Sequence, residues 1–256
     1  MVRNLLVRGM LVGILAGLLA FGFLKVFGEP QVDRAIAFEA RMEQAKAATE
    51  AAGGSPAAEE EPELVSRPVQ AGIGLFTGVV VFGAAIGGLF ALVFASASGR
   101  LAATGPRATA AILAAIGFVT VYLAPFVKYP ANPPAVGEPE TIQIRTALYF
   151  AMILISVVAM LGAVLLRRRL VGRHGAWNAS LFAGLAYLLV IVVANFALPT
   201  VNEVPEQFPA DLLWQFRIAS VGAQVILWTT LGLAFGPLAE HAMRRQATAR
   251  HVLAAS

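Results

Sequence analysis

Two proline-rich segments of the sequence, 128–140 and 198–211, hold closely spaced side chains that could bind a cation. Their carboxylates and amides are Asn132, Glu138, Glu140, Asn202, Glu203, Glu206 and Asp211. Hard oxygen ligands of this type suit divalent cations, whereas imidazole binds cobalt or nickel more selectively. The sequence therefore predicts that the carboxylates of these two segments gather metal ions without selecting among them.

Proline gives the same two segments a second property. It fixes φ and removes a backbone donor, so both segments are expected to be stiff and extended. Two interpretations stay open. Either the segments form a defined shape beside a membrane, or the prolines only end the neighbouring helices.

Little else in the sequence could do covalent chemistry. The chain has no cysteine and three histidines, His174, His241 and His251, which excludes disulfides, thiol catalysis and cysteine-based metal sites. No nucleotide-binding loop is recognisable, because the glycine-rich segments lie inside apolar stretches. We therefore predict no enzymatic activity, no catalytic residue and no bound cofactor.

The elements that carry these segments are predicted to be membrane helices. The 256 residues are 58% hydrophobic and 13% charged, with a mean hydropathy of +0.75, whereas a soluble domain carries about 25% charged residues. A spanning helix needs roughly 20 apolar residues. Six stretches qualify, at 5–27, 69–95, 108–127, 146–166, 179–198 and 218–239. The sequence predicts an all-α, polytopic helical membrane protein, a single transmembrane domain over 1–256 with six helices arranged as three hairpins.

The charges predict which ends of these helices face the cytoplasm. The N-terminus, the loops 96–107 and 167–177 and the C-terminal tail together hold 11 of the 19 basic residues and one of the 15 acids. Lysine and arginine near helix ends favour the cytoplasmic side. Both termini are therefore expected in the cytoplasm, with the first stretch a retained helix rather than a signal peptide. Anionic membrane lipid accounts for the basic pI, so no nucleic-acid partner is expected.

The first outer loop is expected to run over 28–68. Its stretch 36–52 looks helical, whereas 53–63 is rich in glycine, proline, alanine and glutamate and is predicted to be disordered. The acidic run Glu59-Glu60-Glu61 is interpreted as part of a solvated linker, with attraction of cations as the alternative.

An arginine precedes each helix that returns from the outer side, namely Arg67, Arg145 and Arg217. Arginine on that side runs against the usual bias. We predict that Arg145 and Arg217 form structural ion pairs with outer-loop carboxylates. The alternative is that they only extend to the membrane interface.

Glycines spaced four residues apart predict close helix packing in lipid. They occur at Gly9, Gly13 and Gly17 in the first stretch. The second stretch holds the pairs Gly74/Gly78 and Gly83/Gly87. These two helices are expected to pack tightly, against each other or against a partner.

Several motifs of the loops and their flanks resemble the CbtA family. They are GEP at 28–30, VDRA at 32–35, KYPANPP at 128–134, RTALY at 145–149, VNEVP at 201–205, FPA at 208–210 and LWQFR at 213–217. The resemblance covers nearly the whole chain. It implies the membrane subunit of a cobalt transporter linked to cobalamin synthesis, in the bacterial cytoplasmic (inner) membrane. It also implies a small, histidine-bearing, single-span partner subunit of the CbtB type. Family descriptions often give five transmembrane segments, whereas the charge pattern here favours six.

Two other functions stay open from the residues alone. The apolar stretches contain no aspartate or glutamate near their centres, so a proton relay of the kind that many carriers use is not recognisable. A transporter of another small solute, or a membrane scaffold or assembly subunit that moves nothing alone, would fit the same residues.

Overall fold

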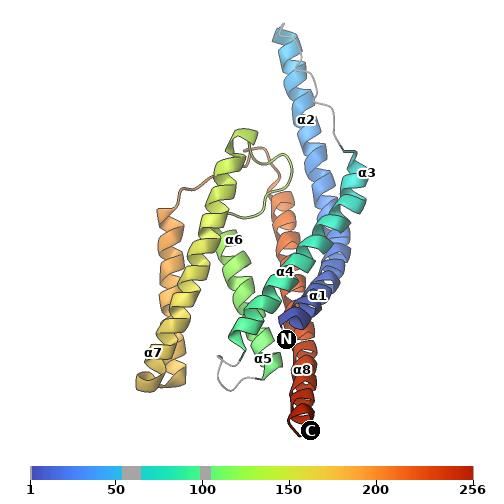
Figure 1. Ribbon diagram of the computed structural model, residues 1–256. Coiled ribbons are helices and arrows are strands. Elements are labelled where there is room, and N and C mark those ends of the chain that lie inside the picture. The colour runs from blue at the N-terminus through green and yellow to red at the C-terminus, as the bar shows by residue number, and fades with distance from the viewer. Residues whose placement is uncertain (1, 54–64, 99–104, 256) are drawn as a thin grey trace. The chain divides into compact units, whose positions relative to one another are not determined.

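A computed structural model describes residues 2–53, 65–98 and 105–255 of the chain (Figure 1). Over these residues the fold is helical and contains no strand. Five helices are long and apolar enough to cross a membrane: Val2–Thr49, Arg67–Ala97, Pro106–Lys128, Pro139–Ala197 and Ala210–Arg245. The all-α, polytopic fold is thereby confirmed, whereas the count of six crossings stays a prediction. The run Glu59-Glu60-Glu61 lies outside the described residues.

The chain divides into two compact units. The first comprises Met1–Ile116, Pro133–Ala135 and Phe208–Ser256, and the second comprises Gly117–Asn132 and Val136–Gln207. A single transmembrane domain over the whole chain stays a prediction.

The first helix of the first unit is longer than the sequence predicted. α1 (Val2–Phe23) continues through a π-helical turn, η1 (Leu24–Gly28), into α2 (Glu29–Gly53), so the helix does not end at Phe27. The outer loop over 28–68 stays a prediction. Pro30 lies inside this continuous helix, where a proline ring normally clashes with the carbonyl of the residue four positions earlier. That residue is Val26, which lies in η1. The wider turn, in which the Glu29 N–H donates to the Leu24 carbonyl, accommodates the proline. The stretch 36–52 is helical as predicted.

Helix α1 packs directly on α4 (Leu75–Ala97), which follows the short α3 (Arg67–Val69) and the π-helical η2 (Gln70–Gly74). Gly9 faces Gly87 and Gly13 faces Gly83. A Cβ atom at any of these four positions would overlap a backbone carbonyl oxygen of the opposite helix, and Gly17 extends the same contact. Glycine is therefore required here because two helix backbones touch.

The second glycine pair of α4 takes no part in this contact. Gly78 has nothing within 4 Å of a Cβ position, and Gly74 meets only the Val69 carbonyl of its own helical segment. Of the predicted small-residue faces in the first two helices, the set that includes Gly83 and Gly87 makes the interface.

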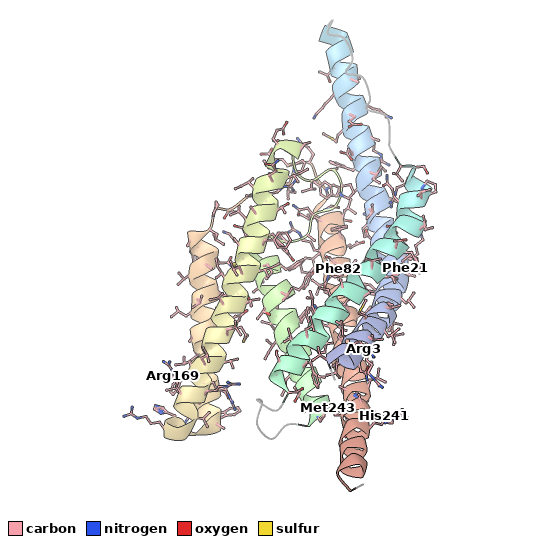
Figure 2. All side chains as sticks on the ribbon, viewed as in Figure 1. Arg3, Phe21, Phe82, Arg169, His241 and Met243 are labelled. Atoms are coloured by element: carbon pink, nitrogen blue, oxygen red, sulfur yellow. The ribbon has the colours of Figure 1, made fainter. Side chains whose placement is uncertain are left out.

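Helix α8 (Ala210–Ala255) completes the first unit. It packs along α1, and Phe235 makes edge-to-face contacts with Phe90 and Phe94 of α4 at centroid distances of 5.4 and 5.1 Å. Gly232 and Gly236 lie against α5 (Pro106–Gly117). Figure 2 places Arg3 at the start of α1 and His241 late in α8 toward the same end of this unit.

The second unit contains η3 (Phe118–Leu123), α6 (Ala124–Lys128), the 3₁₀ turn η4 (Pro139–Thr141) and α7 (Ile142–Ala197). Within α7 the chain reverses at Gly175, whose φ of 74° and ψ of 165° are not helical, and Figure 1 shows the two arms side by side. The Ser156 and Tyr187 hydroxyls lie 2.9 Å apart across the arms, and Arg167 Nε donates to Ser180 Oγ at 2.8 Å. The helices therefore extend into the loop predicted at 167–177.

The Gly87 contact generates a stability prediction. We expect Gly87→Ala to lower the thermal unfolding midpoint of the detergent-solubilised protein, because overpacking costs about 1–3 kcal/mol and the obstacle here is a backbone carbonyl. Gly78→Ala, in the same helix with open space around it, serves as the control and should be neutral or up to about 1 kcal/mol stabilising. Equal midpoints for the two variants would contradict the close backbone contact.

Candidate functional site

The two proline-rich segments begin at neighbouring helix ends within the second unit. Lys128, the last residue of α6, donates from Nζ to the Asn195 backbone oxygen at 2.8 Å and to the Thr200 hydroxyl at 2.9 Å. The next residue, Tyr129, donates from its hydroxyl to the Pro199 carbonyl at 2.8 Å. These bonds hold the residues that follow α6 against those that follow α7.

A second set of contacts joins the segments at Glu203. Its Oε2 accepts a hydrogen bond from the Glu138 backbone N–H at 2.9 Å and lies 3.4 Å from Arg145 Nε. Arg145 also donates from Nη2 to the Glu138 carbonyl at 3.4 Å. The Glu203 side chain is 12% exposed and that of Arg145 is 29% exposed. The carboxylate is thus largely enclosed and paired with a cation, which is the condition under which a charge can be buried.

Local backbone geometry makes room for the guanidinium of Arg145. Gly137 has a φ of 113°, a conformation that residues with a Cβ atom rarely adopt. A Cβ atom placed there would also lie 2.7 Å from Arg145 Cζ. Glycine at this position therefore serves both the turn and the close approach of the arginine.

The surroundings of Glu203 keep it ionised. The Thr141 hydroxyl, then the Glu138 backbone N–H and the positive charge of Arg145, hold the pKa of this carboxyl below its ordinary value of 4.5. Partial desolvation opposes the shift without reversing it. Because the Glu203 carboxylate contacts Glu138 and Arg145, it joins the segment that follows α7 to the segment that precedes it.

The other predicted ligands are more open. Glu138, Glu140, Asn202 and Glu206 are exposed, and Asn132 is half-buried. In the part of the chain that the structure describes, no three histidine, aspartate or glutamate side chains are grouped so that they could hold a metal ion. The ligand set therefore stays a prediction.

Asp211 has a partner in the first unit. Its Oδ2 accepts from Arg34 Nη2 at 2.9 Å, in an ion pair between α8 and α2. Arg217 lies half-buried in α8, near the start of that helix. Its pairing with an outer-loop carboxylate stays a prediction.

Another arginine that precedes a returning helix, Arg67, also contacts carboxylates. It lies 2.5 Å from Glu29 Oε2 and 2.8 Å from Asp33 Oδ1, both on α2. Both acids lie in the motifs GEP and VDRA, but they were not predicted as partners of Arg67. Their spacing of four residues was the available signal, because it places two side chains on one face of a helix. One turn earlier, Lys25 donates from Nζ to the Ala71 carbonyl at 2.9 Å.

Most of the chain, including these contacts, matches one known family. Residues 2–240 match the family described as "Probable cobalt transporter subunit (CbtA)". The chain belongs to the CbtA family. The match covers all of the second unit and most of the first, including the contacts around Glu203 and Arg67. No curated protein and no solved structure matches the chain.

The Arg145–Glu203 contact predicts a reciprocal dependence on charge. We expect Arg145→Glu and Glu203→Arg each to lower the thermal midpoint, and the double exchange to recover part of the loss, because the pair is enclosed. Glu206→Gln, an exposed carboxylate in the same segment, is the control and should have little effect.

The pH dependence of the same comparison follows from the lowered pKa of Glu203. The stabilisation that Glu203 gives should be complete above pH 4.5 and should disappear as the pH falls below that value through the lowered pKa. The midpoint difference between the wild type and Glu203→Gln should therefore shrink on acidification. A difference that stays constant down to pH 3 would contradict the ionic role.

Proposed function

We propose that this CbtA-family protein is the membrane subunit of a bacterial cobalt importer linked to cobalamin synthesis, and that it catalyses no chemical reaction. The observation that carries the proposal is the set of contacts, all within the second unit, that joins the two proline-rich segments. They sit at one end of the helices, are held by Lys128, Tyr129 and Arg145, and carry exposed carboxylates.

The exposed carboxylates would act on cations by attraction. Glu138, Glu140 and Glu206, with Asn202 as a neutral oxygen donor, lie on segments fixed by the contacts of Glu203. Acidic groups on a fixed surface raise the local concentration of cations and speed their capture. Asp211 lies in the first unit, where it pairs with Arg34, and its role as a ligand stays a separate prediction.

Selection of cobalt would require ligands that these segments lack. None of the three histidines lies in 128–140 or 198–211. His174 lies next to the Gly175 turn, at the opposite end of the first arm of α7 from Glu203. His241 and His251 lie in α8. Imidazole would favour cobalt over magnesium, so we assign that role to a small, histidine-bearing, single-span partner subunit.

The orientation is proposed from the charges at helix ends. In the first unit, Arg8 contacts the Leu238 carbonyl, and Arg107 and Arg244 both contact Glu240. The basic residues near the start of α1 and late in α8 thus share one end. By the preference for basic residues on the cytoplasmic side, both termini lie in the cytoplasm and the protein resides in the inner membrane.

The absence of cysteine allows a direct test of this topology. In an otherwise unchanged chain, Glu206→Cys should react with a membrane-impermeant maleimide in intact spheroplasts. Ala176→Cys, at the turn of α7, should react only after permeabilisation. Labelling of both positions from the same side would contradict six crossings, because the second arm of α7, which lies between them, must then fail to span the bilayer.

Cobalt uptake tests the function itself. Cells that lack their own cobalt importer should accumulate cobalt when the protein and its histidine-bearing partner are expressed together. Glu203→Gln and Arg145→Gln should reduce the initial rate several-fold, because the segments lose their junction. Arg250→Ala, in the C-terminal part of α8, is the control and should leave the rate unchanged. Membrane abundance is measured for every variant.

The outcome also separates the alternative functions. If cells with both proteins accumulate no more cobalt, nickel or other divalent metal than cells with neither, the transporter proposal fails. A membrane scaffold would then be the better assignment.

A further inference from the structure

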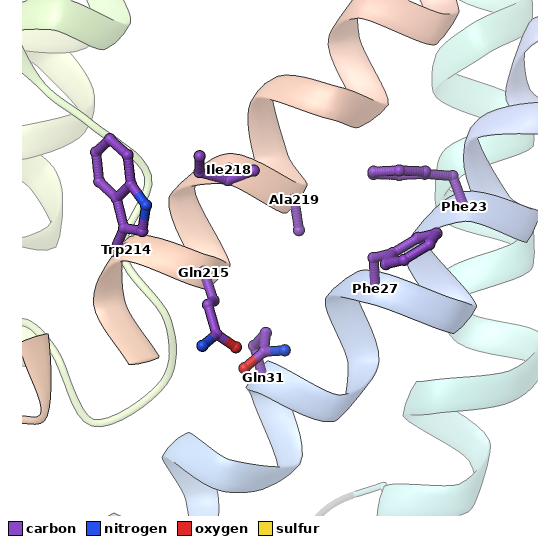
Figure 3. A pocket seen from close by; sticks show the side chains of 7 residues that line it. All are labelled: Phe23, Phe27, Gln31, Trp214, Gln215, Ile218 and Ala219. Atoms are coloured by element: carbon purple, nitrogen blue, oxygen red, sulfur yellow. The ribbon is translucent and has the colours of Figure 1, made fainter. Parts of the chain in front are cut away.

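A groove of about 230 Å³ lies between the α1–α2 junction and the start of α8, entirely within the first unit (Figure 3). It is lined by Phe23, Phe27, Gln31, Trp214, Gln215, Ile218 and Ala219. The predicted apolar stretch 5–27 ends at Phe27, and the predicted apolar stretch 218–239 begins at Ile218. The groove therefore straddles the boundary between the apolar part of these helices and their polar ends.

Two amides form the polar end of the groove. Arg34 Nη1 donates to Gln31 Oε1 at 3.0 Å and to Gln215 Oε1 at 3.2 Å. Because a guanidinium only donates hydrogen bonds, both amides must turn their oxygens toward it. Their NH₂ groups remain, and among the described residues neither has a hydrogen-bond partner. Figure 3 shows the two side chains next to each other at this end.

The charges beside the amides come as a pair. Arg34 Nη2 donates to Asp211 Oδ2 at 2.9 Å, and their side chains stay 48% and 61% exposed. The pair is neutral overall, yet it presents a cation and an anion side by side. A ligand that carries both charges complements such a surface better than one that carries only a negative charge.

We propose that this groove binds a phospholipid with a zwitterionic, amine-bearing headgroup. One acyl chain lies along Phe23, Phe27 and Ile218. The amide NH₂ groups of Gln31 and Gln215 donate to the ester or phosphate oxygens. The ammonium of the headgroup donates to the exposed Asp211 carboxylate. This inference concerns the first unit and does not depend on which ion the protein carries.

The small volume and the mainly apolar lining of the groove suit a flexible hydrocarbon chain. Trp214, which is 65% exposed, has an apolar ring and a polar N–H and so suits the level of lipid headgroups.

Photo-crosslinking from the groove identifies its occupant. A benzophenone amino acid replaces Ile218 in the full chain, which is reconstituted in vesicles of equal parts phosphatidylethanolamine and phosphatidylglycerol. The comparison position is Phe196, which is 87% exposed near the end of α7. We expect adducts with the mass of a lipid at both positions, with a several-fold excess of phosphatidylethanolamine only at 218. An equal ratio at the two positions, or an adduct with a protein at 218, would overturn the proposal.

Lipid retention measures the contribution of the polar end. After transfer to mild detergent, native mass spectrometry should detect one phosphatidylethanolamine on the wild type. The double substitution Gln31→Leu with Gln215→Leu removes two hydrogen-bond donors and should weaken retention about tenfold. Gln143→Leu, at an exposed position in the first turn of α7, should not.

A charge variant tests the headgroup preference separately. Asp211→Asn should reduce the preference for phosphatidylethanolamine over phosphatidylglycerol. If the wild type and the double glutamine variant retain lipid equally, the groove is not a lipid site. If Asp211→Asn leaves the preference unchanged, the assignment of the headgroup is wrong.

Discussion

A hydrocarbon environment offers no hydrogen-bond partner to a peptide group, so a chain that crosses it must satisfy its backbone within helices. The proline positions of this protein show how closely the chain observes that constraint. Pro30 and Pro125 each follow a π-helical turn by two residues. In both cases the residue just before the proline donates its N–H to the carbonyl five positions earlier, in place of the usual four. The helix is widened at these points and remains continuous.

The same constraint explains where helices approach each other and how. In lipid there is no hydrophobic driving force that brings apolar helices together, so helix association depends on close packing. The reciprocal contacts of Gly9 with Gly87 and of Gly13 with Gly83 bring the backbones of α1 and α4 together. In the second unit the two arms of α7 instead use a buried hydroxyl pair, Ser156 and Tyr187, beside a small core that includes Ala163 and Ala183.

Charged contacts among the described residues gather toward the ends of the helices. Arg67 joins α3 to α2 through Glu29 and Asp33, and Arg145 joins the start of α7 to the segment that follows it. Arg34 joins α2 to α8. Such contacts give the polar ends a defined shape while the apolar parts face lipid.

The sequence by itself determined the class of the protein, the approximate helices and the segregation of charge. Each of these properties follows from the hydrophobicity and charge of residues that are neighbours in the sequence, so no long-range contact is needed to predict it. The motif residues also indicated the CbtA family. The continuation of the first helix beyond Phe27 was not predicted, because whether a helix can contain Pro30 depends on the turn before it.

Only the tertiary structure decided which distant residues meet. It placed Glu203, among several nearby carboxylates, beside Arg145, and it separated Gly87, which is in contact, from Gly78, which is not. It also brought Gln31 and Gln215 to one groove from positions far apart in the chain. The physical reason is that ion pairs and close packing depend on distances of a few ångströms between segments, whereas composition and spacing constrain only each segment.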